Sequence, residues 1–405
     1  MSSNPTHGSS PDHPVYVVGA GPGGLATAAV LGSRGVRAVV VERSDDVAAS
    51  WRGHYDRLRL HTTRRWSSLP GLPIPRSAGR WVRRDDFVRY LEDYAEYHQL
   101  DLATGVEVSR IDRAAGADAA GPAPAGSGDW LLQANGGRVL RASAVVVATG
   151  YNHTPLMPDW PGRDEYTGEL LHSSHYRAAE PFAGRDVLVV GAGNSGAEIA
   201  ADLAAGGAAR VRLSVRTVPH ILRRSTLGWP SQASAVLCRR LPVGLVDRLA
   251  RPLERSLPDL TSFGLPRPDT GLYSRVRQGS IPLLDTGRTG LVRAVRRRRV
   301  EPVAAVASFD GAKVLLSDGE AIGPDAVIAA TGYRRGLEPL VGHLGVLDGR
   351  GGPLVHGRET HPAAEGLYFT GYANPISGAL RELALDAPRI ARAITRRRST
   401  AAGRR

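Results

Sequence analysis

The stretch VYVVGAGPGGLATAAVLGSRG, from Val15 to Gly35, joins a short β-branched run, a glycine-rich turn and an alanine- and leucine-rich segment. This order predicts a buried strand that leads through a tight turn into a helix. The stretch VLVVGAGNSGAEIAADL, from Val187 to Leu203, repeats the pattern near the middle of the chain. Both stretches contain the G-x-G-x-x-G spacing that is typical of dinucleotide-binding turns, so we expect the chain to hold two nucleotides.

The first turn has a distinct predicted role for each glycine. Gly19 allows the tight turn, Gly21 lets the backbone approach a pyrophosphate at the helix N-terminus, and Gly24 permits close contact between helix and strand. The next predicted strand, Val36–Val41, ends in Glu42. A carboxylate at this place accepts hydrogen bonds from both hydroxyls of an unphosphorylated ribose, as in FAD or NAD, and repels a 2′-phosphate.

The second turn has the same frame, but its following strand, Val211–Arg216, ends in a cation. A guanidinium at this position pairs with a ribose 2′-phosphate, which favours NADPH over NADH. The alternative is that Arg216 is an ordinary surface arginine. The contrast between Glu42 and Arg216 predicts FAD at the first turn and NADPH at the second, where the predicted contacts are Gly191, Gly193, Asn194, Ser195 and Gly196.

An enzyme with these two cofactors passes hydride from the nicotinamide to the flavin, and the fate of the flavin electrons is then the open question. A disulfide reductase needs a pair of cysteines to receive them. Cys238 is the only cysteine in the chain, which argues strongly against that class. Transfer to O2 or to a separate redox protein remains.

Composition sets further bounds on the chain of 405 residues, a length that suggests two or three domains. The net charge of +13 comes almost wholly from arginine, with Lys313 as the only lysine, and the arginines are scattered without interleaved aromatic residues. This pattern does not favour nucleic-acid binding. No apolar run approaches the ~18 residues that a membrane span needs. We therefore expect a cytoplasmic protein without a metal, whose oligomeric state the sequence leaves open.

The order of the motifs predicts an α/β fold with two Rossmann-like dinucleotide-binding domains. The NADPH domain would be inserted in a discontinuous FAD domain, because DAVIAATGY (Asp325–Tyr333) echoes AVVVATGY (Ala144–Tyr151) late in the chain. The predicted parts are a disordered N-terminus at 1–13 and the first FAD segment at 14–165. The NADPH domain, with an inserted substrate-side segment, follows at 166–324. The second FAD segment at 325–395 and a basic disordered tail at 396–405 complete the chain.

Between the two turns lies YTGELLHSSHY, from Tyr166 to Tyr176. It resembles the F-x-G-x-x-x-H-x-x-x-(F/Y) fingerprint of flavin-containing monooxygenases, with Tyr166 in place of the family's phenylalanine. The segments 42–75 and 241–268, and the order of all the motifs, look like the plant YUCCA-type branch. The resemblance covers about residues 14–395.

This resemblance implies a mechanism. NADPH reduces FAD, O2 adds to the flavin to give a C4a-(hydro)peroxide, and NADP+ stays bound to shield that intermediate. The oxygen then passes to a nucleophilic N or S atom. In the YUCCA branch the substrate is instead a 2-oxo acid, indole-3-pyruvate, which loses CO2 to give indole-3-acetate. The protein would supply a dry pocket and fixed hydrogen bonds.

The resemblance also assigns residues. His61 is the candidate catalytic residue, as a hydrogen-bond donor near the flavin, although a histidine that only orders its loop is an equal alternative. His172 of the fingerprint is expected to be structural. The further residues that match cofactor-contacting motifs, or that lie at strand ends facing the cleft, are Gly19, Gly21, Gly23, Gly24, Glu42, Arg43, Trp51, Arg52, Asn152, Tyr333 and Gly371.

Other functions remain as alternatives. The main one is an NADPH-dependent flavin reductase that passes electrons to an acidic redox protein, which the basic composition would suit. A flavoprotein kept only for binding has little support because both turns are intact. Baeyer–Villiger monooxygenases usually carry Trp-Pro where this chain has Tyr176-Arg177, which disfavours that reaction. The substrate stays undefined: Trp229 and the leucine-rich segment after it would either wall an apolar pocket or belong to the core.

Overall fold

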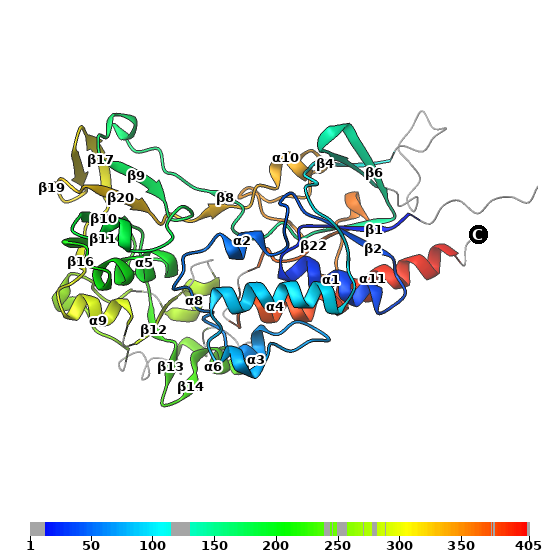
Figure 1. Ribbon diagram of the computed structural model, residues 1–405, viewed down its shortest axis with the longest axis horizontal. Coiled ribbons are helices and arrows are strands. Elements are labelled where there is room, and N and C mark those ends of the chain that lie inside the picture. The colour runs from blue at the N-terminus through cyan, green and yellow to red at the C-terminus, as the bar shows by residue number, and fades with distance from the viewer. Residues whose placement is uncertain are drawn as a thin grey trace, which may run out of the picture.

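The structure is a computed structural model that describes residues 13–114, 130–238, 257–269, 271–277, 282–287, 289–373 and 377–402, together with 244, 246–248 and 375. The predicted disordered N-terminus, apart from His13, lies outside these residues. Within the described ranges, two five-stranded sheets, each parallel throughout, form the centres of two lobes (Figure 1). This arrangement shows an α/β fold.

The first sheet has the order β22-β7-β1-β2-β3. Its strands are buried on both faces, which explains their continuous runs of valine and alanine. One face is covered by α1 (Pro22–Gly32), α4 (Arg84–Tyr97) and α11 (Ala379–Ala402), which lie side by side in Figure 1. The strands are β1 (Val15–Val18), β2 (Ala38–Val41), β3 (Asp101–Ala103), β7 (Ala144–Val147) and β22 (Leu367–Phe369).

The second sheet has the order β16-β11-β10-β20-β9. Helices α5 (Asn194–Ala205) and α9 (Leu291–Arg296) cover one face, where Ile199 and Leu203 pack against the valines of β10. The strands are β9 (Glu169–His172), β10 (Asp186–Val190), β11 (Arg210–Ser214), β16 (Glu301–Val303) and β20 (Ala326–Ala329).

The two lobes repeat one plan. Each contains a strand, a glycine turn, a helix and a parallel strand, and each has a three-stranded antiparallel meander later in the chain. The meander covers the second face of its sheet. In the first lobe the strand after the meander, β7, pairs with β1, and in the second lobe β20 pairs with β10. The meander strands are β4 (Val108–Arg113), β5 (Trp130–Ala134), β6 (Arg138–Ala142), β17 (Val306–Asp310), β18 (Lys313–Leu316) and β19 (Ala321–Ile322).

The predicted boundary at residue 325 is wrong. Strand β20 belongs to the second sheet, where it pairs with β10 and with β9. The chain rejoins the first sheet only at β22, which pairs with β7. The two ATGY motifs echo each other because β7 and β20 hold equivalent places in two similar lobes, and an apolar strand does not reveal in which sheet it lies.

The predicted disordered tail is also wrong over its described part, because α11 continues to Ala402. Alanine and arginine, which dominate this segment, both have high helix propensity. Arg398 adds a tertiary contact, since its Nη1 donates to Ser143 Oγ at 3.1 Å.

The segments after the two ATGY motifs meet each other. Strand β8 (Thr154–Pro155) pairs antiparallel with β21 (Tyr333–Arg334), between the lobes in Figure 1. Among the described helices, none is both long and apolar enough to cross a membrane. The remaining elements are α2 (Ala49–Arg52), α3 (Arg64–Ser67), α6 (Ser231–Cys238), α8 (Leu272–Arg277), α10 (Glu338–Val341), β12 (Ile221–Arg223), β13 (Ser225–Thr226), β14 (Trp229–Pro230) and β15 (Leu283–Asp285).

The two glycine turns have nearly the same backbone. Gly19 and Gly191 both have a φ of +110°, which L side chains rarely adopt. A Cβ added at Gly24 would lie 1.9 Å from the carbonyl oxygen of Gly19, and one added at Gly196 would lie 1.9 Å from that of Gly191. Gly24 and Gly196, the last glycines of the two G-x-G-x-x-G motifs, are therefore required by the contact between helix and strand, as predicted.

This geometry predicts a contrast within each turn. Gly24→Ala and Gly196→Ala should each lower the free energy of unfolding by about 3 kcal/mol, because the added methyl group overlaps a backbone oxygen. Gly21→Ala and Gly193→Ala should change it by less than about 1 kcal/mol, because a Cβ there meets nothing within 4 Å and the φ angles are ordinary. Urea unfolding followed by circular dichroism measures both effects, and equal losses at all four positions would contradict this account.

Candidate functional site

The first turn lies beside the carboxylate that the sequence predicted for it. Glu42 follows β2, and its Oε2 accepts a hydrogen bond from the N–H of Ala20 at 2.8 Å, while Oε1 accepts one from Ser44 at 3.0 Å. The start of α1 at Gly21 faces open space. An open, glycine-lined helix N-terminus beside a fixed carboxylate fits the pyrophosphate and ribose of a dinucleotide.

Two further predicted contacts, both on α2, connect that short helix to α4. Arg52 Nη2 lies 2.6 Å from Glu92 Oε1 in a half-exposed ion pair. The Trp51 ring packs edge-on against Phe87, with centroids 4.6 Å apart. Helix α2 is thus held over the same face of the first sheet that α1 covers.

The other residues predicted for the first nucleotide lie after strands, except Gly23, which is in α1. Gly371 follows β22 with a φ of +88°, and Arg43, after β2, contacts His153 with 3.3 Å between Nη1 and Nε2. Gly23 packs closely on Leu383 of α11. Asn152 lies in an exposed turn after β7.

The second turn opens into a cavity of about 380 Å³. Gly191 and Gly193 line it, and so does Arg216, which is exposed two residues after β11. Apolar side chains from three separate segments also line the cavity. The lining includes Leu156, Pro158, Trp160, Val218, Pro219 and Leu272, with His220 and Arg275 as polar members.

Asn194, the first residue of α5, has a structural partner. Its Oδ1 accepts a hydrogen bond from the N–H of Leu284 at 2.8 Å, and its Nδ2 donates to the Pro282 carbonyl at 3.3 Å. The adjacent Ser195 is half-buried. Asn194 thus ties β15 to the beginning of the helix at the second turn.

Two carboxylates on α5 connect the lobes. Glu198 and Asp202 lie one helical turn apart, so their side chains occupy one face. The Tyr55 hydroxyl donates to Glu198 Oε2 at 2.6 Å, and Arg57 Nη1 donates to Asp202 Oδ1 at 2.5 Å. The Tyr176 hydroxyl donates to Asp202 Oδ2 at 2.8 Å. Burial, together with the neighbouring carboxylates, raises the pKa of both tyrosines, so both remain hydrogen-bond donors.

His61, the candidate catalytic residue, reaches the same carboxylate. Its Nε2 lies 3.3 Å from Glu198 Oε1, and its side chain is 23 % exposed. Burial lowers the pKa of His61 below 6.5, Glu198 opposes that shift and Arg224 adds to it. The imidazole is therefore neutral at pH 7. The Glu198 carboxylate beside Nε2 favours the tautomer that carries its proton on that nitrogen. Its Nδ1 is buried and has no hydrogen-bond partner among the described residues.

The fingerprint residues before and at the end of β9 are held within the second lobe. The Tyr166 hydroxyl donates to the Pro324 carbonyl at 2.6 Å, and a Cβ at Gly168 would overlap the Tyr166 ring. His172 is buried and donates from Nε2 to the Gly332 carbonyl at 3.0 Å, because its Nδ1 accepts the N–H of Ser174. The ring of Tyr333 packs edge-on against it. These contacts agree with a structural role for His172.

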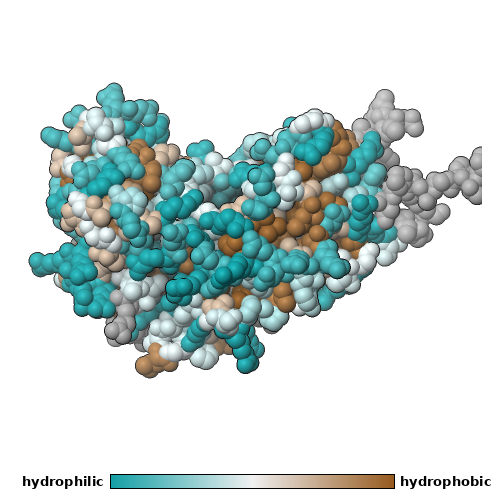
Figure 2. All heavy atoms as spheres, in the orientation of Figure 1, coloured by the Kyte–Doolittle hydropathy of each residue, from teal (hydrophilic) through white to brown (hydrophobic). Residues whose placement is uncertain are grey.

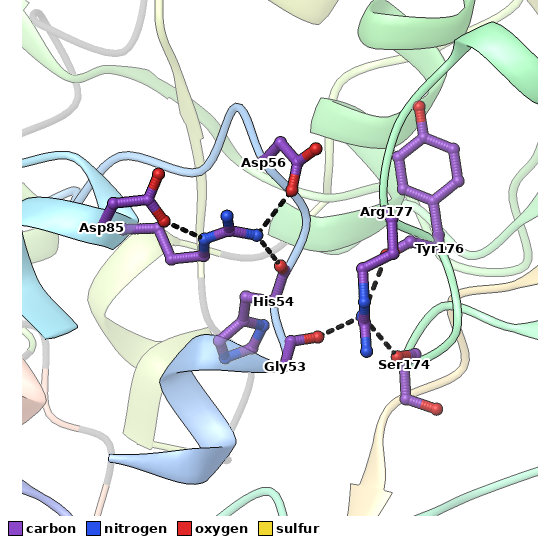
Figure 3. Close-up of polar contacts among 8 residues, drawn as sticks. Gly53, His54, Asp56, Asp85, Ser174, Tyr176 and Arg177 are labelled. Carbon is purple, nitrogen blue, oxygen red and sulfur yellow. Dashed lines mark hydrogen bonds and ion pairs between the residues drawn. The ribbon is translucent and has the colours of Figure 1, made fainter. Parts of the chain in front are cut away.

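Two arginines enclose the loop after α2, as Figure 3 shows. Arg177, in the segment between β9 and β10, donates to the carbonyls of Gly53 and Ser174. Its own carbonyl accepts the N–H of Asp56. Arg84 of α4 donates to the His54 carbonyl at 2.5 Å from the other side. Burial, followed by these two cations, lowers the pKa of His54 to about 4, so it stays neutral.

Sequence reasoning missed Glu198 and Asp202. The signal was present, because two acids spaced i, i+4 interrupt an otherwise apolar helix that begins at a nucleotide turn. Their partners Tyr55 and Arg57 lie more than 140 residues away in the sequence, at a separation of 143 and 145 residues respectively. No local pattern could have paired them.

Comparisons with known proteins agree with this geometry. Residues 16–226 match the family described as pyridine nucleotide-disulphide oxidoreductase. The indole-3-pyruvate monooxygenase YUCCA1 of Oryza sativa subsp. japonica is 39% identical over 363 residues, which cover 88% of this chain and 86% of that protein.

Solved structures show the same fold. A flavin-containing monooxygenase from Stenotrophomonas maltophilia superimposes with a TM-score of 0.71 at 24% identity, covering 95% of this chain and 99% of that one. The structure described as OTEMO in complex with FAD and NADP gives 0.71 at 17% identity, covering 97% and 87%. The chain therefore belongs to the flavin-containing monooxygenases, in the branch of the YUCCA indole-3-pyruvate monooxygenases, and is an oxidoreductase of the monooxygenase class.

Proposed function

We propose that the two lobes are two Rossmann-like domains, with FAD held at the first turn and NADPH at the second. The observation that carries this proposal is the pair of open glycine turns with opposite charges after the following strand, Glu42 in one and Arg216 in the other. The carboxylate accepts ribose hydroxyls, and the guanidinium pairs with a 2′-phosphate. The solved OTEMO structure, which contains FAD and NADP, supports the assignment by analogy of fold.

The proposed reaction transfers one atom of O2 to a small organic substrate, either a 2-oxo acid such as indole-3-pyruvate with loss of CO2, or a nucleophilic N or S atom. FAD, reduced by NADPH, supplies the oxygen chemistry, by the family's route through a flavin C4a-(hydro)peroxide. The curated relatives named for indole-3-pyruvate favour the 2-oxo acid. We also propose that the protein is cytoplasmic.

In this proposal the chain's own residues position groups and exclude water. Helix α5 begins at the nicotinamide-nucleotide turn, and its Glu198 and Asp202 hold the loop that carries His61. The loop cannot move away from α5 without breaking three buried or half-buried polar contacts. Fixed dipoles in a site closed to bulk water are what an oxygen-activating cofactor requires from its protein.

His61 then acts through Nδ1. A neutral ring whose Nε2 proton faces Glu198 offers Nδ1 as a hydrogen-bond acceptor, since only the protonated ring donates from both nitrogens. We propose that Nδ1 accepts a hydrogen bond from a donor on the bound cofactor or substrate. This replaces the donor role that the resemblance implied.

The alternative, a flavin reductase that serves an acidic redox protein, is not favoured. The relatives that cover most of the chain are monooxygenases. The fingerprint contacts from Tyr166 to Tyr176 also fit an enzyme of that class.

The first test follows the oxygen atom. Holoenzyme incubated with NADPH, indole-3-pyruvate and 18O2 should give indole-3-acetate that contains one labelled oxygen, and rapid mixing of reduced enzyme with O2 should reveal a flavin–oxygen adduct by absorbance. Phenylpyruvate, an amine and a thioether in parallel reactions define the substrate class. Unlabelled products, together with reduction of a ferredoxin faster than O2 consumption, would favour the alternative.

The second test concerns Arg216. Arg216→Gln should raise KM for NADPH about 10- to 150-fold, because a charge-assisted hydrogen bond is worth about 1.5–3 kcal/mol, and should leave KM for NADH nearly unchanged. Arg210→Gln, at the start of β11 and paired with Glu301 at the surface, is the matched control. Equal effects of Arg216→Gln on both nucleotides would show that Arg216 does not contact the 2′-phosphate.

The third test concerns Glu198. Because Glu198 raises the pKa of His61, Glu198→Gln should lower that pKa further. If the neutral ring is the active form, activity falls as the pH drops through this pKa, so the acidic limb of the kcat profile should shift to lower pH in the variant. The amount of product per NADPH should fall about tenfold, because the loop is less firmly held.

His61→Gln should remove that acidic limb, and Glu301→Gln, a surface control on β16, should leave the profile unchanged. A limb that stays in place in both the His61 and the Glu198 variants would assign it to another group.

A further inference from the structure

Exposed apolar side chains gather at one place. Of the six large apolar side chains that are more than half exposed in the described part of the chain, three lie between Leu227 and Leu237. Leu227 is 104 % exposed, Leu237 71 % and Trp229 56 %. The alternative that Trp229 belongs to the core is therefore wrong, and most of the leucine-rich segment after it lies outside the described residues. Clusters of this kind mark interaction surfaces more often than singly exposed residues do.

The backbone at this place presents the apolar groups outward. Strands β13 and β14 form a hairpin whose two turn residues, Leu227 and Gly228, have φ angles of +47° and +79°. Such a turn favours asparagine or aspartate followed by glycine. Here a leucine occupies the strained position, which places an apolar side chain at the tip of the hairpin.

A basin rich in arginine adjoins this hairpin tip. The basin has a volume of about 400 Å³ and is lined by Arg64, Arg65, Arg76 and Arg80, and none of the residues that line it is acidic. Pro230 of the hairpin also lines it. Arg80 joins the two features directly, since its Nη2 donates to the carbonyl of Gly228 at 2.6 Å. One face thus combines a cationic basin with a projecting apolar tip.

The hairpin and the arginine-rich basin lie at the edge of the molecule. Figure 1 puts α3, α6, β13 and β14 together at the lower edge, and Figure 2 shows brown atoms beside teal ones at that edge. The hairpin and the basin come from segments about 150 residues apart that the Arg80 contact brings together.

We propose that this face docks the protein on the surface of an anionic lipid bilayer. The arginines of the basin bind phosphate and carboxylate headgroups, and Leu227 and Trp229 enter the interface between headgroups and acyl chains. Stable binding of a protein to a membrane surface needs two signals of this kind, a basic patch and an apolar insertion. Tryptophan is enriched at that depth. Charge complementarity favours lipid over a second copy of this chain, whose own basin would repel it.

Co-sedimentation of the holoenzyme with vesicles tests the proposal. The protein should partition onto phosphatidylcholine vesicles that contain about 30% phosphatidylserine at about 0.15 M salt, and far less onto pure phosphatidylcholine. Arg65→Gln with Arg76→Gln should weaken this binding about 30-fold. Leu227→Ser with Trp229→Ser should weaken it at least tenfold. All variants should retain FAD and the wild-type rate of NADPH oxidation, because these residues lie outside the proposed cofactor sites.

Matched controls separate this face from general attraction, because a chain with a net charge of +13 is drawn to anionic lipid from any side. Arg34→Gln with Arg37→Gln removes the same charge from an exposed loop after α1, and Val139→Ser with Leu354→Ser removes exposed apolar groups elsewhere. Binding unaffected by both controls supports the proposal. Equal weakening by the arginine control, no binding of the wild type, or a dimer that the hairpin variants dissolve would each overturn it.

Discussion

The arrangement of this enzyme depends on two carboxylates on one helix. Glu198 and Asp202 project from α5, which starts at the second glycine turn, and they bind Tyr55, Arg57 and His61 of a loop from the first lobe. Buried charges are tolerated only where each has partners, and removal of one partner leaves the other uncompensated. The helix that begins at the second glycine turn therefore also fixes a loop of the first lobe.

The segment between β9 and β10 strengthens this connection. Tyr176 shares Asp202 with Arg57, and Arg177 donates to the carbonyl of Gly53 after α2, while Arg84 donates to that of His54 (Figure 3). Hydrogen bonds from side chains to backbone carbonyls hold a loop without fixing its side-chain sequence. The hydrogen bonds of Tyr166 and His172 lie within the second lobe, so this part of the fingerprint orders that lobe.

Much of the architecture could be predicted because its causes are local. The glycine turns require positive φ angles and close backbone contacts, so Gly19, Gly24, Gly191 and Gly196 identify both turns and the strands before them. Strand β20 was misassigned because its apolar run suits either sheet, and only the pairing with β10 decides between them. The interlobe contacts of Glu198 could not be predicted either, since they join residues that only the tertiary fold brings together. The helical end of α11 could not be predicted from its run of arginines, because such a run occurs both in exposed helices and in disordered tails.

The family description names disulphide oxidoreductases, yet this chain has one cysteine and thus no intramolecular dithiol to reduce. The matched residues, 16–226, include both glycine turns. We propose that each turn holds a different nucleotide. Hydrogen–deuterium exchange of the apoprotein tests it directly: FAD should protect residues 19–24 and NADP+ residues 191–196. Protection of 19–24 by NADP+ instead, or of neither turn, would contradict it.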